Sequence, residues 1–77
     1  MVKKYSNLYL EARRSFMRME DEQTASLLAR SLLCYVSSKS QEEIVAQREV
    51  YASEEVCQAM ETAVKRVLAG EPLAYVL

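Results

Sequence analysis

The sequence predicts an all-α fold, a small orthogonal or antiparallel bundle of four main helices with a short fifth turn at the C-terminus. Three observations support this prediction. Apolar residues recur at steps of three and four, which is the period of helices packed on one side. The composition, with 51% hydrophobic residues, one glycine and one proline, suits helices joined by short loops. At 77 residues the chain is long enough for one domain with one core.

The first helix is predicted over residues 3–18. Apolar side chains follow helical spacing there, so they share one face of the helix. That face consists of Tyr5, Leu8, Tyr9, Ala12, Phe16 and Met19. Glu11, Arg14 and Arg18 are expected to point to solvent. The acidic residues 20–22 then supply a connection and a favourably charged start for the next helix.

The second helix, predicted over residues 21–36, is the most apolar segment, and we expect it at the centre of the bundle. A helix that is apolar over most of its circumference usually contacts several neighbours. Its predicted main face consists of Ala25, Leu28, Leu32, Tyr35 and Val36, with Ala29 and Leu33 beside them. Replacing Leu28 or Leu32 with alanine is therefore expected to cost about 2–5 kcal/mol.

A short third helix is predicted after the polar turn at residues 37–39. Ser40 and Glu43 have the spacing of a capping box, in which each side chain bonds the backbone of the other residue. We expect this helix to end near residues 47–48. The apolar side chains expected to face the core here are Ile44, Val45 and either Val50 or Tyr51.

Residues 53–69 have the most regular pattern and predict the fourth helix. Ser53 is a favourable N-cap, and the acidic and basic residues near the two ends complement the helix dipole. Gly70 can adopt the left-handed conformation that ends a helix, and Pro72 prevents its continuation and can begin the short fifth turn. The predicted buried face consists of Val56, Met60, Ala63, Val64 and Val67, widened by Cys57 and Leu68.

The residue inventory argues against catalysis and against a metal centre in these 77 residues. The chain has no histidine and only one glycine, so it lacks the usual proton-transfer group near neutral pH and any glycine-rich phosphate loop. Cys34 and Cys57 are far apart in sequence and have no Cys-x-x-Cys spacing. We interpret them as reduced, partly buried thiols rather than zinc ligands or nucleophiles. No catalytic, cofactor-binding or metal-binding residue is predicted.

The charge distribution is informative about partners. The net charge of −1 gives no electrostatic reason for binding nucleic acid or a membrane. There is no apolar run of about 18 residues and no signal-peptide core, so a cytoplasmic location is expected. The first 18 residues nevertheless contain five lysines and arginines against one glutamate. This segment is interpreted first as a solvated helix face, with Arg14 and Arg18 as candidate contacts for a partner.

The C-terminal segment Ala-Val-Lys-Arg-Val-Leu-Ala-Gly-Glu-Pro-Leu-Ala-Tyr-Val-Leu, residues 63–77, carries a family resemblance. It resembles the junction after the N-terminal helical domain of the HemK/PrmC family, the peptide-chain release factor glutamine methyltransferases. Residues 24–28 with residues 32–33 also resemble the second-helix pattern of that family. One departure is Cys34, where relatives often carry a helix-ending glycine. The second helix is therefore expected to continue through Tyr35 and Val36.

The resemblance implies a larger enzyme. Its Rossmann-like catalytic domain, with an Asn-Pro-Pro-Tyr motif, would transfer a methyl group from S-adenosylmethionine to the Gly-Gly-Gln glutamine of class 1 release factors. None of those catalytic residues lies in this chain. The resemblance implies that residues 1–70 form a substrate-recognition domain, and that residues 71–77 begin an interdomain linker.

In this interpretation the partners are the release factor and the enzyme's own catalytic domain, and the fragment is monomeric. The resemblance gives Gly70, Glu71, Pro72 and Tyr75 a structural role at the exit between the domains. An ordinary helix stop explains Gly70 and Pro72 equally well, but it explains Glu71 and Tyr75 less well.

Two other functions remain open at this stage. One is a stand-alone helical adaptor that binds a partner protein, which a stop codon directly after residue 77 would favour. The other is a small nucleic-acid-binding bundle, for which strongly salt-dependent binding would be the signature. An open reading frame that continues into a cofactor-binding domain would favour the methyltransferase interpretation.

Overall fold

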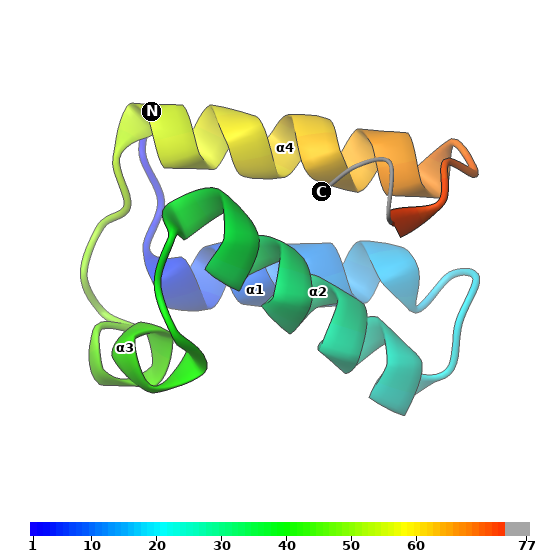
Figure 1. Ribbon diagram of the computed structural model, residues 1–77, viewed down its shortest axis with the longest axis horizontal. Helices are drawn as coiled ribbons and strands as arrows, with labels where there is room; N and C mark the ends of the chain where they lie inside the picture. The colour runs from blue at the N-terminus through cyan, green and yellow to red at the C-terminus, as the bar shows by residue number, and fades with distance from the viewer. Residues whose placement is uncertain (74–77) are drawn as a thin grey trace.

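A computed structural model describes residues 1–73 of the chain (Figure 1). The described part contains four helices, which confirms the all-α prediction. They are α1 Tyr5–Phe16, α2 Glu22–Ser37, α3 Gln41–Ala46 and α4 Glu54–Leu68. The predicted fifth turn falls mainly on residues 74–77, and this prediction, like Tyr75, lies outside the described residues.

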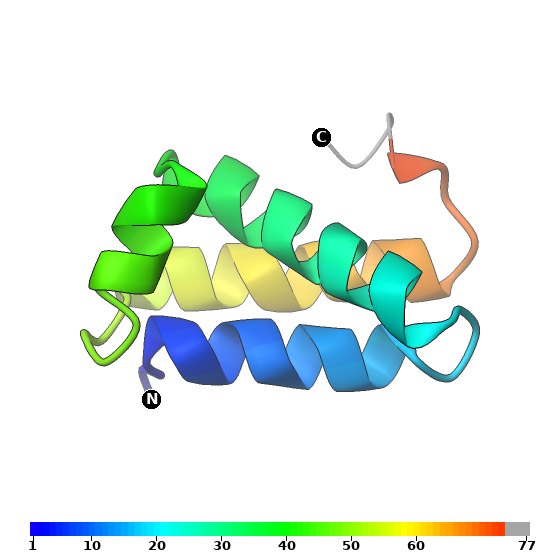
Figure 2. The same cartoon turned by 90° about the horizontal axis from the view of Figure 1, so that it is seen from below.

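Helix α2 is the central element, as the sequence predicted. Helices α1 and α4 lie side by side and run in the same direction, while α2 crosses them obliquely in the opposite direction (Figures 1 and 2). The short α3 closes one end of the bundle. Because α2 packs against each of the other three helices, it must be apolar over much of its circumference.

The core is formed by side chains from all three long helices. Its largest fully buried members are Phe16, Leu32, Leu33 and Met60. Small residues lie between them and allow the helices to approach closely. These buried small residues are Ala12, Ala25, Ala29, Ala52 and Ala63. On α4, the predicted face is confirmed at Met60, Ala63, Val67 and Cys57, whereas Leu68 is exposed.

The buried face of α2 is rotated relative to the prediction. Ala29 and Leu33, which were placed beside the main face, are fully buried. Tyr35 is 55% exposed, so its assignment to the core was wrong. An apolar stripe this broad does not by itself define which side of α2 faces the other helices. The side that carries the alanines is buried, because small side chains let the helices approach closely. On α1, Met19 is also exposed, because the helix ends at Phe16 and helical spacing no longer applies.

The connection from α3 to α4 also differs from the prediction. Val45 and either Val50 or Tyr51 were expected to face the core, but all three side chains are exposed. Tyr51 instead forms an isolated antiparallel bridge with Lys4. In this bridged segment the amide of Ala52 donates to the carbonyl of Lys3 at 2.9 Å. Neighbouring side chains of an extended segment point to opposite sides, so Ala52 is buried while Tyr51 faces solvent.

The predicted caps are confirmed where the structure tests them. The hydroxyl of Ser53 accepts a hydrogen bond from the amide of Val56 at 3.2 Å. Ser40 and Glu43 form both bonds of the capping box, at 3.0 and 3.2 Å. Such bonds satisfy amides that have no partner inside the helix.

The end of α2 lies beyond Cys34, as expected from the cysteine that stands where relatives often carry a helix-ending glycine. Ser38 ends the helix with φ 56°, and it is the one non-glycine residue with positive φ in the described chain. Its amide donates to the carbonyl of Tyr35 at 3.2 Å, and the next amide, of Lys39, donates to that of Cys34 at 3.2 Å. The left-handed conformation costs a side-chain-bearing residue about 1–2 kcal/mol, a cost that glycine avoids.

Replacing Ser38 with glycine is therefore expected to raise the free energy of unfolding by about 0.5–1 kcal/mol, because glycine removes the left-handed penalty but has more freedom when unfolded. Chemical denaturation measures the change. The matched control is Ser37→Gly, one residue earlier within the helix, which should lower stability because Ser37 also donates to the carbonyl of Leu33 at 2.6 Å. A loss of stability in the Ser38→Gly variant would contradict this account of the helix end.

Candidate functional site

The exit from α4 is the first part of the candidate site. Gly70 has φ 95°, which confirms the predicted left-handed helix end. Its amide donates to the carbonyl of Val67 at 3.0 Å, and the amide of Glu71 donates to that of Arg66 at 3.2 Å. These two bonds define a Schellman motif. A Cβ at Gly70 would meet nothing within 4 Å, so backbone conformation rather than space favours glycine here.

The side chains of Arg66 and Glu71 meet across this helix end. Nε of Arg66 donates to both carboxylate oxygens, at 3.2 and 3.1 Å, and Nη2 donates to Oε1 at 2.9 Å. These hydrogen bonds hold the pKa of Glu71 below its usual range and raise the pKa of Arg66. From the sequence alone, Arg66 is one of the basic residues near the C-terminal end of α4 that were assigned only to complement the helix dipole. A basic residue five positions before an acidic one, across a helix-ending glycine, was the signal for this pair.

The chain after the ion pair turns back toward the bundle. Pro72 is exposed, and Leu73 is partly buried against the hydrophobic core. In Figure 1 this segment, in red, turns back at the C-terminal end of α4 and lies below it in the view. Gly70, Glu71 and Pro72 follow one another at this helix end, and their role at an exit between domains stays a prediction. Tyr75, the fourth residue predicted there, lies outside the described residues.

The second part of the candidate site is the outward side of α1. Arg14 and Arg18 are exposed, as predicted; Arg14 lies on α1, and Arg18 lies two residues beyond its end at Phe16. Among residues 1–73, neither has a carboxylate within ion-pair distance, whereas five other basic side chains do. The paired ones are Lys3, Lys4, Arg13, Lys65 and Arg66.

Exposed apolar side chains accompany these two arginines. Leu10 and Met17 are each 44% exposed and lie three or four residues from Arg14 on the same helix or its end. Because α1 and α4 run in the same direction, the C-terminal turn of α1 and the exit from α4 are at the same end of the bundle (Figure 1). We call Leu10, Arg14, Met17 and Arg18 the α1 surface. It combines apolar area with two cationic groups that have no intramolecular partner within the described range.

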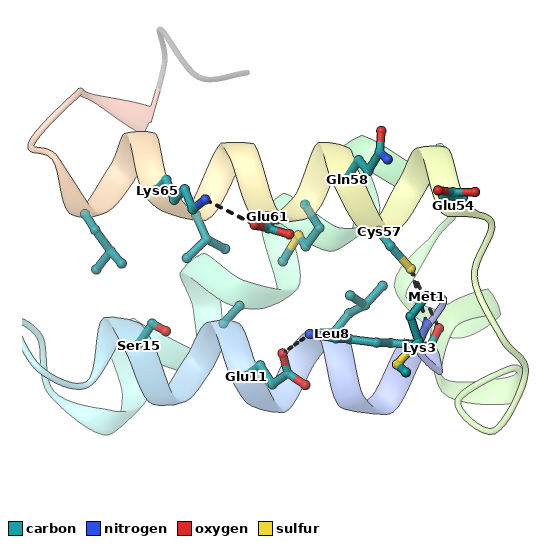
Figure 3. Close-up of a pocket in the computed structure, with 14 residues that line it drawn as sticks. Met1, Lys3, Leu8, Glu11, Ser15, Glu54, Cys57, Gln58, Glu61 and Lys65 are labelled. Atoms are coloured by element: carbon teal, nitrogen blue, oxygen red, sulfur yellow. Dashed lines mark hydrogen bonds and ion pairs between the residues drawn. The ribbon is translucent and has the colours of Figure 1, made fainter.

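A groove of about 570 Å³ lies between α1 and α4 (Figure 3). Ion pairs lie along it: Lys3 with Glu11 at 2.6 Å, and Lys65 with Glu61 at 3.1 Å. Cys57 lines one end, where its Sγ accepts a hydrogen bond from the amide of Lys3 at 3.4 Å. The sequence analysis did not find this groove, because its lining depends on the alignment of two helices that are distant in sequence.

The environment of Cys34 does not activate its thiol. Both cysteines are free; Cys57 is buried, and burial raises the pKa of the Cys34 thiol. A thiolate nucleophile requires the opposite shift. Within residues 1–73 no three His, Cys, Asp or Glu side chains are grouped as metal ligands would be. No helix of this part of the chain is long and apolar enough to span a membrane.

The described residues form a small all-α domain that ends in a hydrogen-bonded turn at the C-terminus of α4. Comparison with protein-family models gives a match to the PrmC N-terminal domain over residues 8–77. The match covers nearly the whole chain, so the chain belongs to this family, and the resemblance found in the sequence is confirmed. Membership implies a parent protein of a methyltransferase family. Searches of curated proteins and of solved structures gave no match.

Proposed function

We propose that this chain is the non-catalytic N-terminal domain of an S-adenosylmethionine-dependent release factor glutamine methyltransferase. In this proposal it helps recognise and position the class 1 release factor whose Gly-Gly-Gln glutamine is methylated. The family match over residues 8–77 supports the proposal. S-adenosylmethionine would be bound by the catalytic domain of the parent enzyme, which is expected to act in the cytoplasm.

A recognition domain has a clear physical purpose in such a reaction. A large folded substrate must be oriented before one glutamine can enter a methyltransferase pocket. A rigid second surface supplies that orientation, because it fixes position and angle before the chemical step. Residues 1–73 provide a rigid body of this kind, built on the fully buried side chains of Phe16, Leu32, Leu33 and Met60.

The observation that most supports a docking role is the α1 surface. Arg14 and Arg18 are exposed and, like Arg30, Lys39 and Arg48, have no ion-pair partner in the described range, while the adjacent Arg13 is paired with Glu22. Unpaired arginines next to exposed apolar side chains are typical of protein-binding surfaces, where arginine is enriched. Charge complementarity then calls for an acidic region on the release factor. The location near the exit of α4 would place that contact beside the catalytic domain.

Reversing Arg14 and Arg18 to glutamate in the parent enzyme is expected to weaken release factor binding by about tenfold or more, because two attractive contacts become repulsive. Isothermal titration calorimetry with purified release factor measures the affinity. The matched control reverses Arg30 of α2 and Arg48 of the α3–α4 connection to glutamate, which makes the same change in net charge away from the α1 surface. Unchanged affinity in the first variant, or an equal loss in both, would contradict a contact at the α1 surface.

A further inference from the structure

We propose that Arg66 and Glu71 form a latch that fixes the direction in which the chain leaves α4. Both residues lie at the Schellman motif, on opposite sides of the left-handed Gly70. Arg66 belongs to the last turn of α4, and its backbone is fixed by the helix. Glu71 is the second residue beyond the C-cap Ala69, where helical geometry no longer sets the direction of the backbone.

Glu71 is attached to Arg66 by two independent sets of bonds. Its amide donates to the carbonyl of Arg66 at 3.2 Å. Its carboxylate accepts three donor contacts from the guanidinium, at distances from 2.9 to 3.2 Å. A planar guanidinium that bonds both carboxylate oxygens restricts angle as well as distance. Backbone and side chain of Glu71 are thus held by the same helical residue.

This pair replaces the contact that usually accompanies a Schellman motif. The two positions involved, in the last helical turn and two residues beyond the cap, commonly make a hydrophobic contact. Here they carry opposite charges instead. Gly70 and Pro72 are sufficient to stop the helix, and Pro72 also restricts the backbone of Glu71 to extended conformations. The ion pair adds a side-chain constraint to these backbone constraints and gives Glu71 a structural role that a helix stop does not provide.

Leu73 supplies a second anchor further along the chain. It is partly buried against the core, two residues after Glu71. The path over residues 70–73 is therefore held at both ends, by the ion pair and by the apolar contact. The consequence for catalysis rests on the proposed function: a fixed exit would keep the α1 surface in one orientation relative to the catalytic domain. The latch itself does not depend on that function.

The latch is tested in this chain by amide hydrogen exchange and residual dipolar couplings of residues 70–73. Arg66→Leu and Glu71→Leu should each lower the exchange protection of the Glu71 amide about two- to fivefold, as expected for an exposed ion pair. Each should also change the couplings of residues 71–73 relative to α4. The double variant should recover both, because two leucines restore the usual hydrophobic contact. The matched control is Lys65→Leu, one position before Arg66 on α4. It breaks the ion pair between Lys65 and Glu61 and should leave the exchange protection and the couplings of residues 70–73 unchanged.

Two results would overturn the latch. One is exchange protection and couplings in the single variants equal to those of the unmodified chain. The other is a double variant in which the loss of protection equals the sum of the losses in the two single variants. A further readout is the titration of the Glu71 carboxyl, whose pKa should return to its usual range in Arg66→Leu. In the parent enzyme, Arg66→Leu should raise KM for the release factor and leave the rate on a short Gly-Gly-Gln peptide unchanged. If the latch holds in this chain but KM does not change, the proposed coupling to substrate recognition fails while the latch stands.

Discussion

Replacing Phe16 with alanine is expected to lower the free energy of unfolding by about 3–5 kcal/mol. Phe16 is fully buried at the C-terminal end of α1 and is among the largest side chains of the core. Its removal takes away a large apolar surface and leaves a cavity that the surrounding helices can fill only in part. At roughly 0.05–0.15 kcal/mol per residue, the whole domain has about 4–12 kcal/mol of stability, so this single loss could unfold it.

Chemical denaturation of the variant and the unmodified chain measures this effect. The matched control is Met17→Ala at the neighbouring position, where the side chain is 44% exposed. Because its side chain is already partly in water, that variant should change stability much less, by roughly 0.5 kcal/mol. Equal losses at Phe16 and Met17 would contradict the position of the core.

Leu32→Ala is expected to cost about 2–5 kcal/mol, and the order of three leucines on α2 is the sharper test. The sequence analysis treated Leu28 and Leu32 as equivalent core positions. The structure separates them, because Leu32 is fully buried while Leu28 is only partly buried. Leu27 is 54% exposed. The expected losses therefore fall from Leu32 to Leu28 to Leu27.

The same unfolding measurement on the three alanine variants tests that order. All three changes remove the same atoms from the same helix, so differences in helix propensity cancel and burial alone sets the ranking. A loss at Leu28 as large as that at Leu32 would mean that the face of α2 predicted from the sequence was right. A comparable loss of unfolding free energy at Leu27 would mean that other residues cover that side of α2 as well.

Features that depend on neighbouring residues were predictable from the sequence. The cap at Ser53, the capping box at Ser40 and the helix end at Gly70 each involve residues within a few positions of one another. Their hydrogen bonds follow from local spacing, so the pattern is sufficient. The orientation of apolar side chains was less predictable. Tyr35 and Val45 fit a helical stripe but are exposed, because the neighbours that cover each helix come from distant parts of the chain.

The candidate site shows the same division. Gly70 and Pro72 were predicted from residue type, and the outward direction of Arg14 followed from helical spacing, whereas Arg18 is exposed beyond the end of α1. The ion pair of Arg66 was missed, because a charge near a helix end is usually explained by the helix dipole alone. The α1–α4 groove could not be found without the packing of the two helices. The docking partner, the domain boundary near residue 70 and the role of Tyr75 stay predictions.

The most direct test of the central claim compares the parent enzyme with a version that lacks residues 1–70. Each is assayed for methyl transfer to folded release factor and to a short peptide that contains Gly-Gly-Gln. If this domain only orients a folded substrate, its removal should lower kcat/KM for the release factor by about 100-fold and leave the peptide reaction unchanged. Equal kcat/KM values for the release factor with and without residues 1–70 would contradict the claim.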